Sequence, residues 1–481
     1  MSVANYSASI TIRDNGLGIV DAGSDGVGCL IGTCSTGTAG TFYSYAGSGT
    51  NQAKDDLGRG PLADHTVKNL LRSGGKQTVA YKTTATTAGS SSAITRSGGA
   101  VGPLPTLSGA PYDYANAILT VVLGGAVGTA TFKYSLDGGD NYSQTLTTAA
   151  SYLLDSNVTV TFTAGTYVAG ETYSWTDTAP TFSTSDVSTA LDAVIDSIYD
   201  PEFVHVLGHA SSAANSATMA ATISTKVDAA WAAHKYFFAV MEAPMDTPAN
   251  IITAFSSVEQ KGLMVCGGFA EVINERSGEI EKKSSGRIIG PRIARNPIAI
   301  HLARDAADSD LDACDDVTAL VPTGMASSTG YHDEDATPAY SAGRMSSLRT
   351  INGRDGFYVA NGLTRAASTS DFQQVQYLRI ILKAARAWYK YALTQLARRV
   401  RVDSTTGFIK NSFAKGIEDG GKAVILTALG DAIEGAKVIV NRADNIVADP
   451  TLRAKIRIAV GSYILTFDSD LGLTSNLTAA A

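Results

Sequence analysis

Charged residues are scarce in this chain. Asp, Glu, Lys and Arg together make up 17% of its 481 residues, below the ~25% that is usual for a soluble protein. The formal net charge is −7, and this acidic balance argues against a general nucleic-acid binder. A weakly charged surface rich in small residues fits one that other protein covers. Hydrophobic residues reach 44%, which excludes an intrinsically disordered chain.

Cysteines and long hydrophobic runs are also few. The four cysteines, Cys29, Cys34, Cys266 and Cys314, are too few for a disulfide scaffold, so reduced thiols and synthesis in a cytoplasm are expected. The most apolar stretch, residues 117–130, is interrupted by glycines, and no run reaches the ~18–20 apolar residues of a membrane span. The first residues show no basic region followed by an apolar stretch, so no secretory signal is expected.

Motifs for phosphate and calcium binding are incomplete. Residues 416–422 fit the first seven positions of a phosphate-binding P-loop, but Ala423 stands where Ser or Thr must hold Mg²⁺. A plain Gly-rich turn is therefore expected there. Asp308, Asp310 and Asp312 begin like a calcium loop, yet the turn glycine and the bidentate glutamate that should follow are both missing. We expect a solvated acidic loop.

Other candidate ligands stand alone. Residues 332–335 (His-Asp-Glu-Asp) have no second cluster at metal-ligand spacing. His205 and His209 lack the glutamate of a zinc-protease helix. Cys29 and Cys34 are interpreted as structural or free thiols. The sequence thus predicts no enzyme, no cofactor and no metal site.

Charge is unevenly distributed along the chain. Between residues 97 and 225, Lys133 stands against 11 acidic residues, a local net charge of −10. Between residues 344 and 457 there are 19 basic and 9 acidic residues, a local net charge of +10. Opposite charge in two parts of one chain fits either an acidic partner for the basic part or head-to-tail self-association. Ordinary solvated surface is the alternative interpretation.

Strands and helices alternate in two parts of the chain. Residues 27–32 and 78–82 are short apolar runs typical of buried strands, and residues 62–71 between them have helical spacing. The alternation returns after Pro180, with helices expected at 185–197, 218–233 and 248–260 and strands at 203–207, 236–241 and 262–266. Such alternation predicts a layered α/β sheet.

A different pattern lies between these parts, in residues 101–182. Short Thr-, Val- and Tyr-rich runs are separated by Gly and Asp turns. In residues 137–140 (Asp-Gly-Gly-Asp), the residue types tolerate the positive φ that a hairpin turn requires. Regularly spaced short strands with almost no helix predict a small all-β sandwich inserted into the α/β chain.

The C-terminal part is expected to hold the clearest helix, residues 371–400, where apolar residues recur at helical spacing. Ser370 and Gln373 fit a capping box at its start. Five basic residues would lie on its remaining surface and are candidate contacts to a tube or a neighbouring subunit: Arg379, Lys383, Arg386, Lys390 and Arg398. The final strand, expected at 455–467, alternates basic and apolar residues, so one face would be buried and the other basic.

Three segments resemble the contractile tail sheath proteins of bacteriophages. The first is the strand at 27–33 (VGCLIGT), followed by a Gly-rich loop, residues 57–62 (LGRGPL), and the helix and strand after them. The second is residues 354–362 (RDGFYVANG) with the long helix that contains Trp388, which is similar to the start of the sheath C-terminal domain. The third is the closing strand with the short tail after it.

The resemblance implies an α/β (α+β) multi-domain sheath-type core with extended terminal strand arms, and the all-β sandwich inserted into this core lies outside the resemblance. The chain would then comprise an N-terminal extended arm (1–20), the first part of the core (21–100), the sandwich on the outer surface (101–182), the second part of the core (183–343), a tube-proximal C-terminal α/β domain (344–454) and a C-terminal strand and arm (455–481).

The resemblance also implies a structural role. Sheath subunits polymerise as stacked helical rings around a tail tube and contract by rearranging their packing, which drives the tube through the host envelope. Partners would be further copies of this chain, the tail tube protein, and baseplate and tail terminator proteins, without direct nucleic-acid contact or membrane insertion. The location would be the phage tail in the virion, after assembly in the cytoplasm of the host bacterium.

Terminal arms of sheath subunits add strands to the sheets of neighbouring subunits, so each arm satisfies an open sheet edge. The residues expected to do this here are Tyr6, Ile10 and Ile12 at the N-terminus and Ile456, Ile458 and Val460 near the C-terminus. Two alternatives remain open at this point. One is another virion structural protein, such as a tube, capsid or fibre component. The other is a soluble α/β enzyme that uses the strand ends near His205 and His209.

Overall fold

The computed structural model divides the chain into two compact units, Met1–Arg379 and Ile380–Ala481. The structure describes residues 25–98, 102–208, 213–244, 246–275, 278, 280–304, 314, 316–321, 337–351 and 354–463. Among these, we find no helix whose length and hydropathy would let it span a lipid bilayer.

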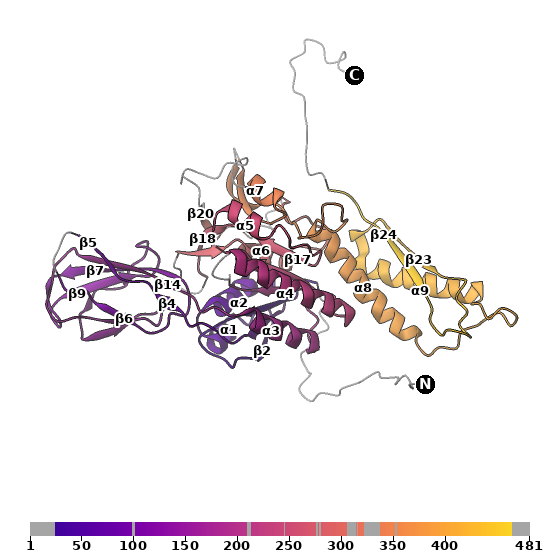
Figure 1. Ribbon diagram of the computed structural model, residues 1–481, viewed down its shortest axis with the longest axis horizontal. Helices are drawn as coiled ribbons and strands as arrows, with labels where there is room; N and C mark the ends of the chain where they lie inside the picture. The colour runs from indigo at the N-terminus through magenta and orange to yellow at the C-terminus, as the bar shows by residue number, and fades with distance from the viewer. Residues whose placement is uncertain are drawn as a thin grey trace, which may run out of the picture. The chain divides into compact units, whose positions relative to one another are not determined.

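A six-stranded sheet forms the centre of the first unit (Figure 1). Its strand order is β17-β16-β15-β1-β3-β2, and every neighbouring pair is parallel except β3 with β2. Four of the strands, β1, β15, β16 and β17, are buried along their whole length, as expected of parallel strands covered on both faces. The bounds are β1 Gly28–Gly32, β2 Phe42–Tyr45, β3 Thr78–Lys82, β15 Phe203–Val206, β16 Phe238–Glu242 and β17 Leu263–Cys266.

Helices cover both faces of this sheet, and successive side chains of a strand point to opposite faces. Cys29 and Ile31 of β1 share one core with α3 (Thr184–Asp196), α4 (Ala213–Ala232) and α5 (Pro248–Ala254). Leu30, between them, points to the opposite core, with α1 (Thr50–Leu57) and α2 (Pro61–Arg72). Helix α6 (Gly286–Arg295) packs beside α2. The layered α/β sheet predicted from the alternation is therefore present.

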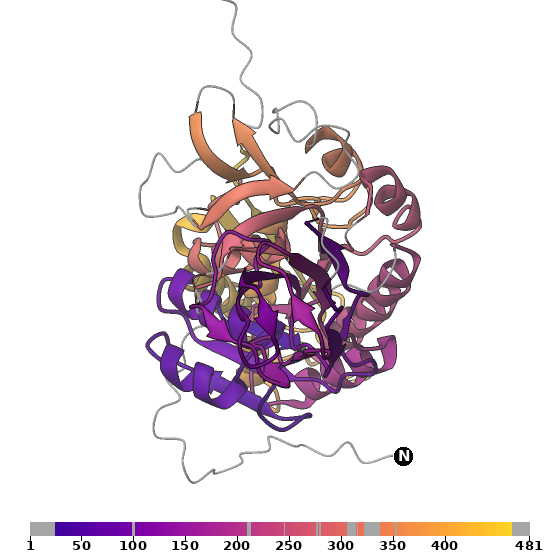
Figure 2. The ribbon, with the colours of Figure 1, turned by 90° about the vertical axis from the view of Figure 1, so that its left-hand side faces the viewer.

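Residues 90–178 form sheets with a core of their own, here called the β region (Figure 2, purple). One sheet has the order β10-β9-β7-β14-β4, with β5 also paired to β14, and smaller sheets are β11-β12-β6 and β13-β8. Aromatic side chains such as Phe132, Tyr173 and Trp175 fill the core. Because β4 and β5 pair with β14, strands of the β region begin before residue 101. The bounds are β4 Ser90–Ser91, β5 Thr95–Ser97, β6 Thr106–Ser108, β7 Ala115–Leu123, β8 Gly125–Ala126, β9 Thr131–Ser135, β10 Leu146–Thr147, β11 Ser151–Leu153, β12 Thr159–Thr161, β13 Thr166–Tyr167 and β14 Thr172–Thr178.

Smaller elements complete the first unit. One sheet has the order β19-β18-β20 and another pairs β21 with β22. The bounds are β18 Phe269–Ile273, β19 Ile280–Ser284, β20 Val317–Val321, α7 Thr337–Ala342, β21 Leu348–Ile351 and β22 Arg354–Val359. Strands β21 and β22 thus lie in the first unit, whereas the sequence predicted a domain boundary at 344.

The second unit consists of most of α8 (Val375–Gln395), α9 (Asn411–Leu429), a short 3-10 helix (Gly430–Ala432), β23 (Gly435–Val440) and β24 (Ala454–Ala459). Helix α8 is shorter than the 371–400 expected. The capping box does not form, because the Gln373 side chain donates to the carbonyls of Ser368 and Ser370 before the helix begins.

Residues 416–423 are not the Gly-rich turn that the sequence predicted, because they lie inside α9. Packing explains the glycines there. A Cβ on Gly421 would lie 2.5 Å from the ring of Trp388, and one on Gly420 would lie 2.5 Å from the hydroxyl of Tyr391. Glycine at these two positions lets α8 approach α9 closely, which offsets the low helix propensity of glycine.

Candidate functional site

The antiparallel pair β23–β24, here called the hairpin, has one apolar and one basic face. Val438 and Val440 of β23 are buried, and α9 packs against this strand. Their partners on β24 are Ile456 and Ala454. The opposite face is exposed and carries Lys437, Ile439, Lys455 and Arg457. Within the described residues each strand of the hairpin pairs only with the other. Both outer edges therefore offer backbone groups to a further strand, except at Val440, whose N–H donates to Glu418.

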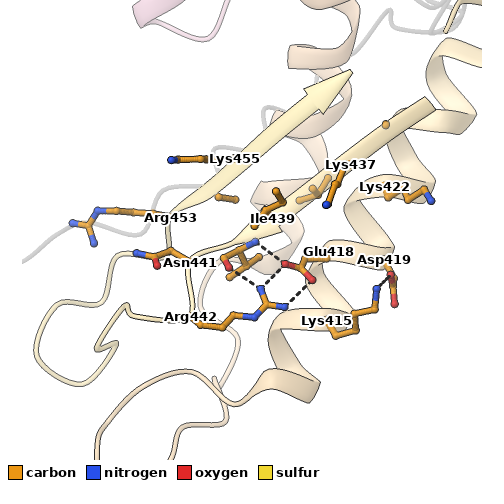
Figure 3. Close-up of a pocket in the computed structure, with 14 residues that line it drawn as sticks. Lys415, Glu418, Asp419, Lys422, Lys437, Ile439, Asn441, Arg442, Arg453 and Lys455 are labelled. Carbon is orange, nitrogen blue, oxygen red and sulfur yellow. Dashed lines mark hydrogen bonds and ion pairs between the residues drawn. The ribbon is translucent and has the colours of Figure 1, made fainter. Parts of the chain in front are cut away.

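A groove runs beside the hairpin (Figure 3). Its volume is about 1080 Å³. The lining is mostly charged, and the residues that line it are Lys415, Glu418, Asp419 and Lys422 of α9, residues 436–442 of and after β23, and Arg453, Ala454 and Lys455. Lys415 pairs with Asp419 at 2.9 Å one helical turn away. Cations outnumber carboxylates in the lining, so the groove has a basic character.

Glu418 and Arg442 form a two-pronged ion pair in this groove, and they face each other in Figure 3. Arg442 Nη2 donates to Glu418 Oε2 at 2.8 Å, and Nη1 donates to Oε1. Arg442 and the backbone N–H of Val440 together hold the pKa of Glu418 at about 2, well below its ordinary value. Glu418 is therefore ionised throughout the physiological pH range.

The predicted arm residues are only partly described. Ile456 and Ile458 lie on β24, opposite Val438 and Ala436, and both are half-buried. Val460 follows the strand and is exposed. Tyr6, Ile10 and Ile12 lie outside the described residues. The structure thus places the beginning of the predicted C-terminal strand in the hairpin of its own chain.

The predicted basic surface of α8 needs correction at two positions. Arg379 is buried in the first unit, where its Nε lies 2.5 Å from Glu202 Oε1 and its Nη2 donates to the carbonyl of Asn296 at 3.0 Å. Arg386 is also buried. Neither side chain therefore lies on the surface. Lys383 is half-buried, and Lys390 and Arg398 are exposed.

Polar groups at the carboxyl ends of the parallel strands pair with one another. His65 Nε2 lies 3.1 Å from His205 Nδ1, and His205 Nε2 lies 3.4 Å from Glu242 Oε1. Glu242 also accepts from Arg287 Nε at 3.1 Å. All four side chains are buried. The adjacent cavity measures about 30 Å³, the volume of about one water molecule. His209 lies outside the described residues.

Of the remaining sequence candidates, the structure describes only the two cysteines. Cys29 and Cys34 are free thiols, and burial raises the pKa of Cys29 to about 12 and that of Cys34 to about 11. Asp308, Asp310, Asp312 and residues 332–335 lie outside the described residues. In the part of the chain that the structure describes, no group of three or more His, Cys, Asp or Glu could hold a metal ion.

Sequence reasoning missed the Glu418–Arg442 pair. The two residues are 24 positions apart, and Glu418 lies in the segment interpreted as a turn. If a helix had been predicted for this segment, Glu418 would have been placed one turn from Lys415 and Lys422. No local sequence pattern indicates that Glu418 contacts Arg442.

Comparisons with known proteins identify the family. The chain matches the family models described as DUF2586, N-terminal domain, over residues 7–363 and DUF2586, C-terminal domain, over residues 371–478. No curated protein sequence matches it.

Solved sheath structures match most of the length of the chain. The helical sheath of the anti-feeding prophage (AFP) in its contracted state is 11% identical with a TM-score of 0.50, and the match covers 98% of this chain and 100% of that chain. The sheath tail protein of Desulfitobacterium hafniense is 12% identical with a TM-score of 0.47, covering 94% and 100%. The sheath tail protein of Listeria innocua is 13% identical with a TM-score of 0.45, covering 91% and 96%.

The AFP match supports the mixed α/β fold with several sheets that the resemblance implied. The family models cover nearly the whole chain, and their boundary between 363 and 371 is close to the division between the two compact units. The chain therefore belongs to the DUF2586 family and has the fold of contractile tail sheath proteins.

Proposed function

We propose that this chain is the structural subunit of a contractile phage tail sheath. It polymerises as stacked helical rings around a tail tube. The observation that carries the proposal is the hairpin, because its two strands pair with no further strand of the described chain, which has a sheath-type fold. A contact that joins the hairpin of one copy to a different surface of the next is heterologous, and such contacts generate open helical arrays when they do not close.

The contact itself is strand addition. The terminal segments of neighbouring copies, with Tyr6, Ile10 and Ile12 at one end and the chain after Val460 at the other, pair with the open edges of the hairpin. Backbone hydrogen bonds provide affinity, and the half-buried Ile456 and Ile458 provide apolar contact on the face toward α9. Exposed cations of α8, Lys390 and Arg398, contact a tube or a neighbouring subunit.

Contraction is a change between two packings of the same subunits, with the extended packing metastable. The energy is then stored in the geometry of assembly, and no nucleotide or cofactor is needed. The buried, mutually paired histidines and the small cavity at the strand ends favour this structural role over an enzyme. The β region is an inserted sandwich on the outer surface of the sheath, which fits its acidic composition.

The partners proposed are further copies of the chain, the tail tube, and baseplate and tail terminator proteins. The location is the virion tail after assembly in the host bacterial cytoplasm. The protein performs its role without direct nucleic-acid contact or membrane insertion. Contraction drives the tube through the host envelope.

Electron microscopy of the purified full-length chain tests the proposal most directly. We expect tubes or rings of constant diameter, and a persistent monomer at high concentration would contradict a sheath role. Removing residues 1–12 should abolish polymerisation if the N-terminal strand is needed, and unchanged tubes would exclude it. Removing residues 103–180 should leave the core fold, and loss of that fold would contradict the insertion.

The β24 edge can be tested by one substitution. The N–H of Ile456 points away from β23, so Ile456→Pro should block an added strand while it keeps the hydrogen bonds of the hairpin. We expect the variant to remain folded by circular dichroism but to stop forming tubes. Ile456→Val is the matched control and should polymerise normally. Normal tubes from Ile456→Pro would exclude this edge as an assembly contact.

A further inference from the structure

The backbone groups on the outer edge of β23 can be assigned from the register of the hairpin. Asn441 donates its N–H to the carbonyl of Arg453, so the bonded pairs include 441 with 453 and recur every second residue. The intervening residues, Ala436, Val438 and Val440, therefore direct their N–H and C=O groups away from β24. These three residues make up the edge that faces the groove.

At Val440 this edge is already occupied. The N–H of Val440 donates to Glu418 Oε1 at 2.8 Å, and its carbonyl accepts from Arg442 Nη1 at 2.6 Å. The N–H of Val440 thus has an acceptor and its carbonyl has a donor. A paired residue of a neighbouring strand would supply the same two groups. The ion pair thus substitutes for one residue of an added strand.

At Val438 and Ala436 the edge remains open. In the described part of the chain β23 pairs with β24 alone, and the groove of about 1080 Å³ lies along these residues. The edge therefore changes from open to closed between Val438 and Val440. Hydrogen bonds in which one of the two groups is ionised are about twice as strong as those between neutral groups, so an incoming strand does not readily displace the pair.

We propose that the Glu418–Arg442 pair is a register stop: it ends strand addition at Val438 and so fixes the position at which a second copy pairs with β23. The inference rests on the proposed sheath function and assigns these two residues as positioning residues for assembly. A stop of this kind is needed because strand pairing is periodic, and a shift in register by one residue exchanges the side chains on the two faces.

The strand comes from the C-terminal segment of the second copy, and charge supports this choice. Residues 464–481 carry Asp468 and Asp470 and no Lys or Arg. Lys415, Lys422 and Lys437 line the groove. The acidic segment and the basic groove are complementary, whereas residues 1–24 include Arg13 beside their two aspartates.

Amide hydrogen exchange at single-residue resolution, read by mass spectrometry on the full-length chain, tests the stop. In unassembled wild type we expect the Val440 amide to exchange at least tenfold more slowly than the Val438 amide. On assembly, protection should rise at Ala436 and Val438 and stay unchanged at Val440. Equal exchange at Val440 and Val438 before assembly would overturn the proposal.

Substitutions then show whether the ion pair, and not burial in general, protects the Val440 amide from exchange. Glu418→Gln should speed exchange at Val440 about tenfold before assembly, and protection should then extend to Val440 in assembled particles. Asp419→Asn is the matched control, since Asp419 lines the same groove and pairs with Lys415 instead. It should behave as wild type. Arg442→Lys, which keeps the charge but loses the two-pronged geometry, should reproduce Glu418→Gln and serves if that variant does not fold.

Two outcomes separate the inference from the function on which it rests. If the wild type assembles and both Glu418→Gln and Arg442→Lys show the same hydrogen-exchange profile as the wild type, the register stop is refuted and the sheath function is unaffected. Wild type that never assembles refutes both. Carbodiimide cross-linking of assembled wild type should join groove lysines to Asp468 or Asp470 of another copy. Cross-links to Asp14 or Asp21 in their place would exclude the C-terminal segment.

Discussion

The close approach of α8 and α9 predicts opposite effects for two glycine-to-alanine substitutions on the same helix. Gly416 and Gly421 both lie inside α9. A Cβ on Gly416 would meet no atom within 4 Å, whereas one on Gly421 would lie 2.5 Å from Cζ3 of Trp388 and 3.3 Å from Cε1 of Tyr391. Both substitutions improve helix propensity equally, so their difference isolates the packing.

The magnitudes follow from these distances. Gly416→Ala should stabilise α9 by ~1 kcal/mol, the propensity difference between glycine and alanine in a helix. Gly421→Ala receives the same gain but must displace a rigid indole ring, and overpacking of this kind costs ~1–3 kcal/mol. Gly421→Ala should therefore be ~1–3 kcal/mol less stable than Gly416→Ala.

Hydrogen exchange of peptides from α9 in the unassembled chain measures this difference, since protection reports the local unfolding free energy. We expect about fivefold more protection in Gly416→Ala than in wild type, and about 5- to 150-fold less in Gly421→Ala than in Gly416→Ala. If the two variants protect α9 equally, Trp388 does not pack against Gly421, and the reason given for the glycines in α9 is wrong.

Three further predictions concern other parts of the molecule. Arg379→Met leaves the carboxylate of Glu202 buried without its guanidinium, so urea unfolding of the first unit should show a loss of ~3–5 kcal/mol. Exposed Arg398→Met in the second unit should change urea unfolding of that unit by under ~0.5 kcal/mol; equal losses would mean that the buried pair is not formed. Burial and the neighbouring His205 lower the pKa of His65 well below 6.5, so the unfolded chain binds a proton that the folded chain does not, and stability should fall by up to ~1.4 kcal/mol per pH unit below about pH 6.5. His65→Gln should flatten this slope in urea titrations at pH 7 and pH 5, and an unchanged slope would contradict the assignment. Lys390→Glu with Arg398→Glu should weaken tube formation in sedimentation assays without loss of folding, and normal sedimentation would exclude these cations from assembly contacts.

Local sequence patterns were sufficient to predict most helices and strands around the central sheet. The apolar run at 203–207 and the periodic segment at 185–197 became β15 and α3 within one residue of the expected bounds. Both segments are long or apolar enough for their periodicity to outweigh the alternatives. The inward stripe of α8 was predicted for the same reason, although its ends were not, because the Gln373 side chain bonds to preceding carbonyls.

Prediction failed where a distant partner overrides local preference. Three glycines between 416 and 421 indicated a turn, and only the rings of Trp388 and Tyr391 explain why Gly420 and Gly421 belong in a helix. Likewise β4 and β5 precede the expected start of the β region, because the strand that pairs with them, β14, lies about 80 residues later.

The amino-acid sequence by itself determined the alternation of strands and helices, the acidic and basic segments of the chain and the resemblance to sheath proteins, because these depend on residue types and short spacings. The tertiary structure alone decided which charged side chains lie on the surface. Periodicity placed Arg379 on the helix surface, but Glu202, 177 residues earlier, holds it in the core. It also brought Glu418 and Arg442 together on the edge of β23. Both outcomes depend on long-range contacts, which have no periodic signal in the chain.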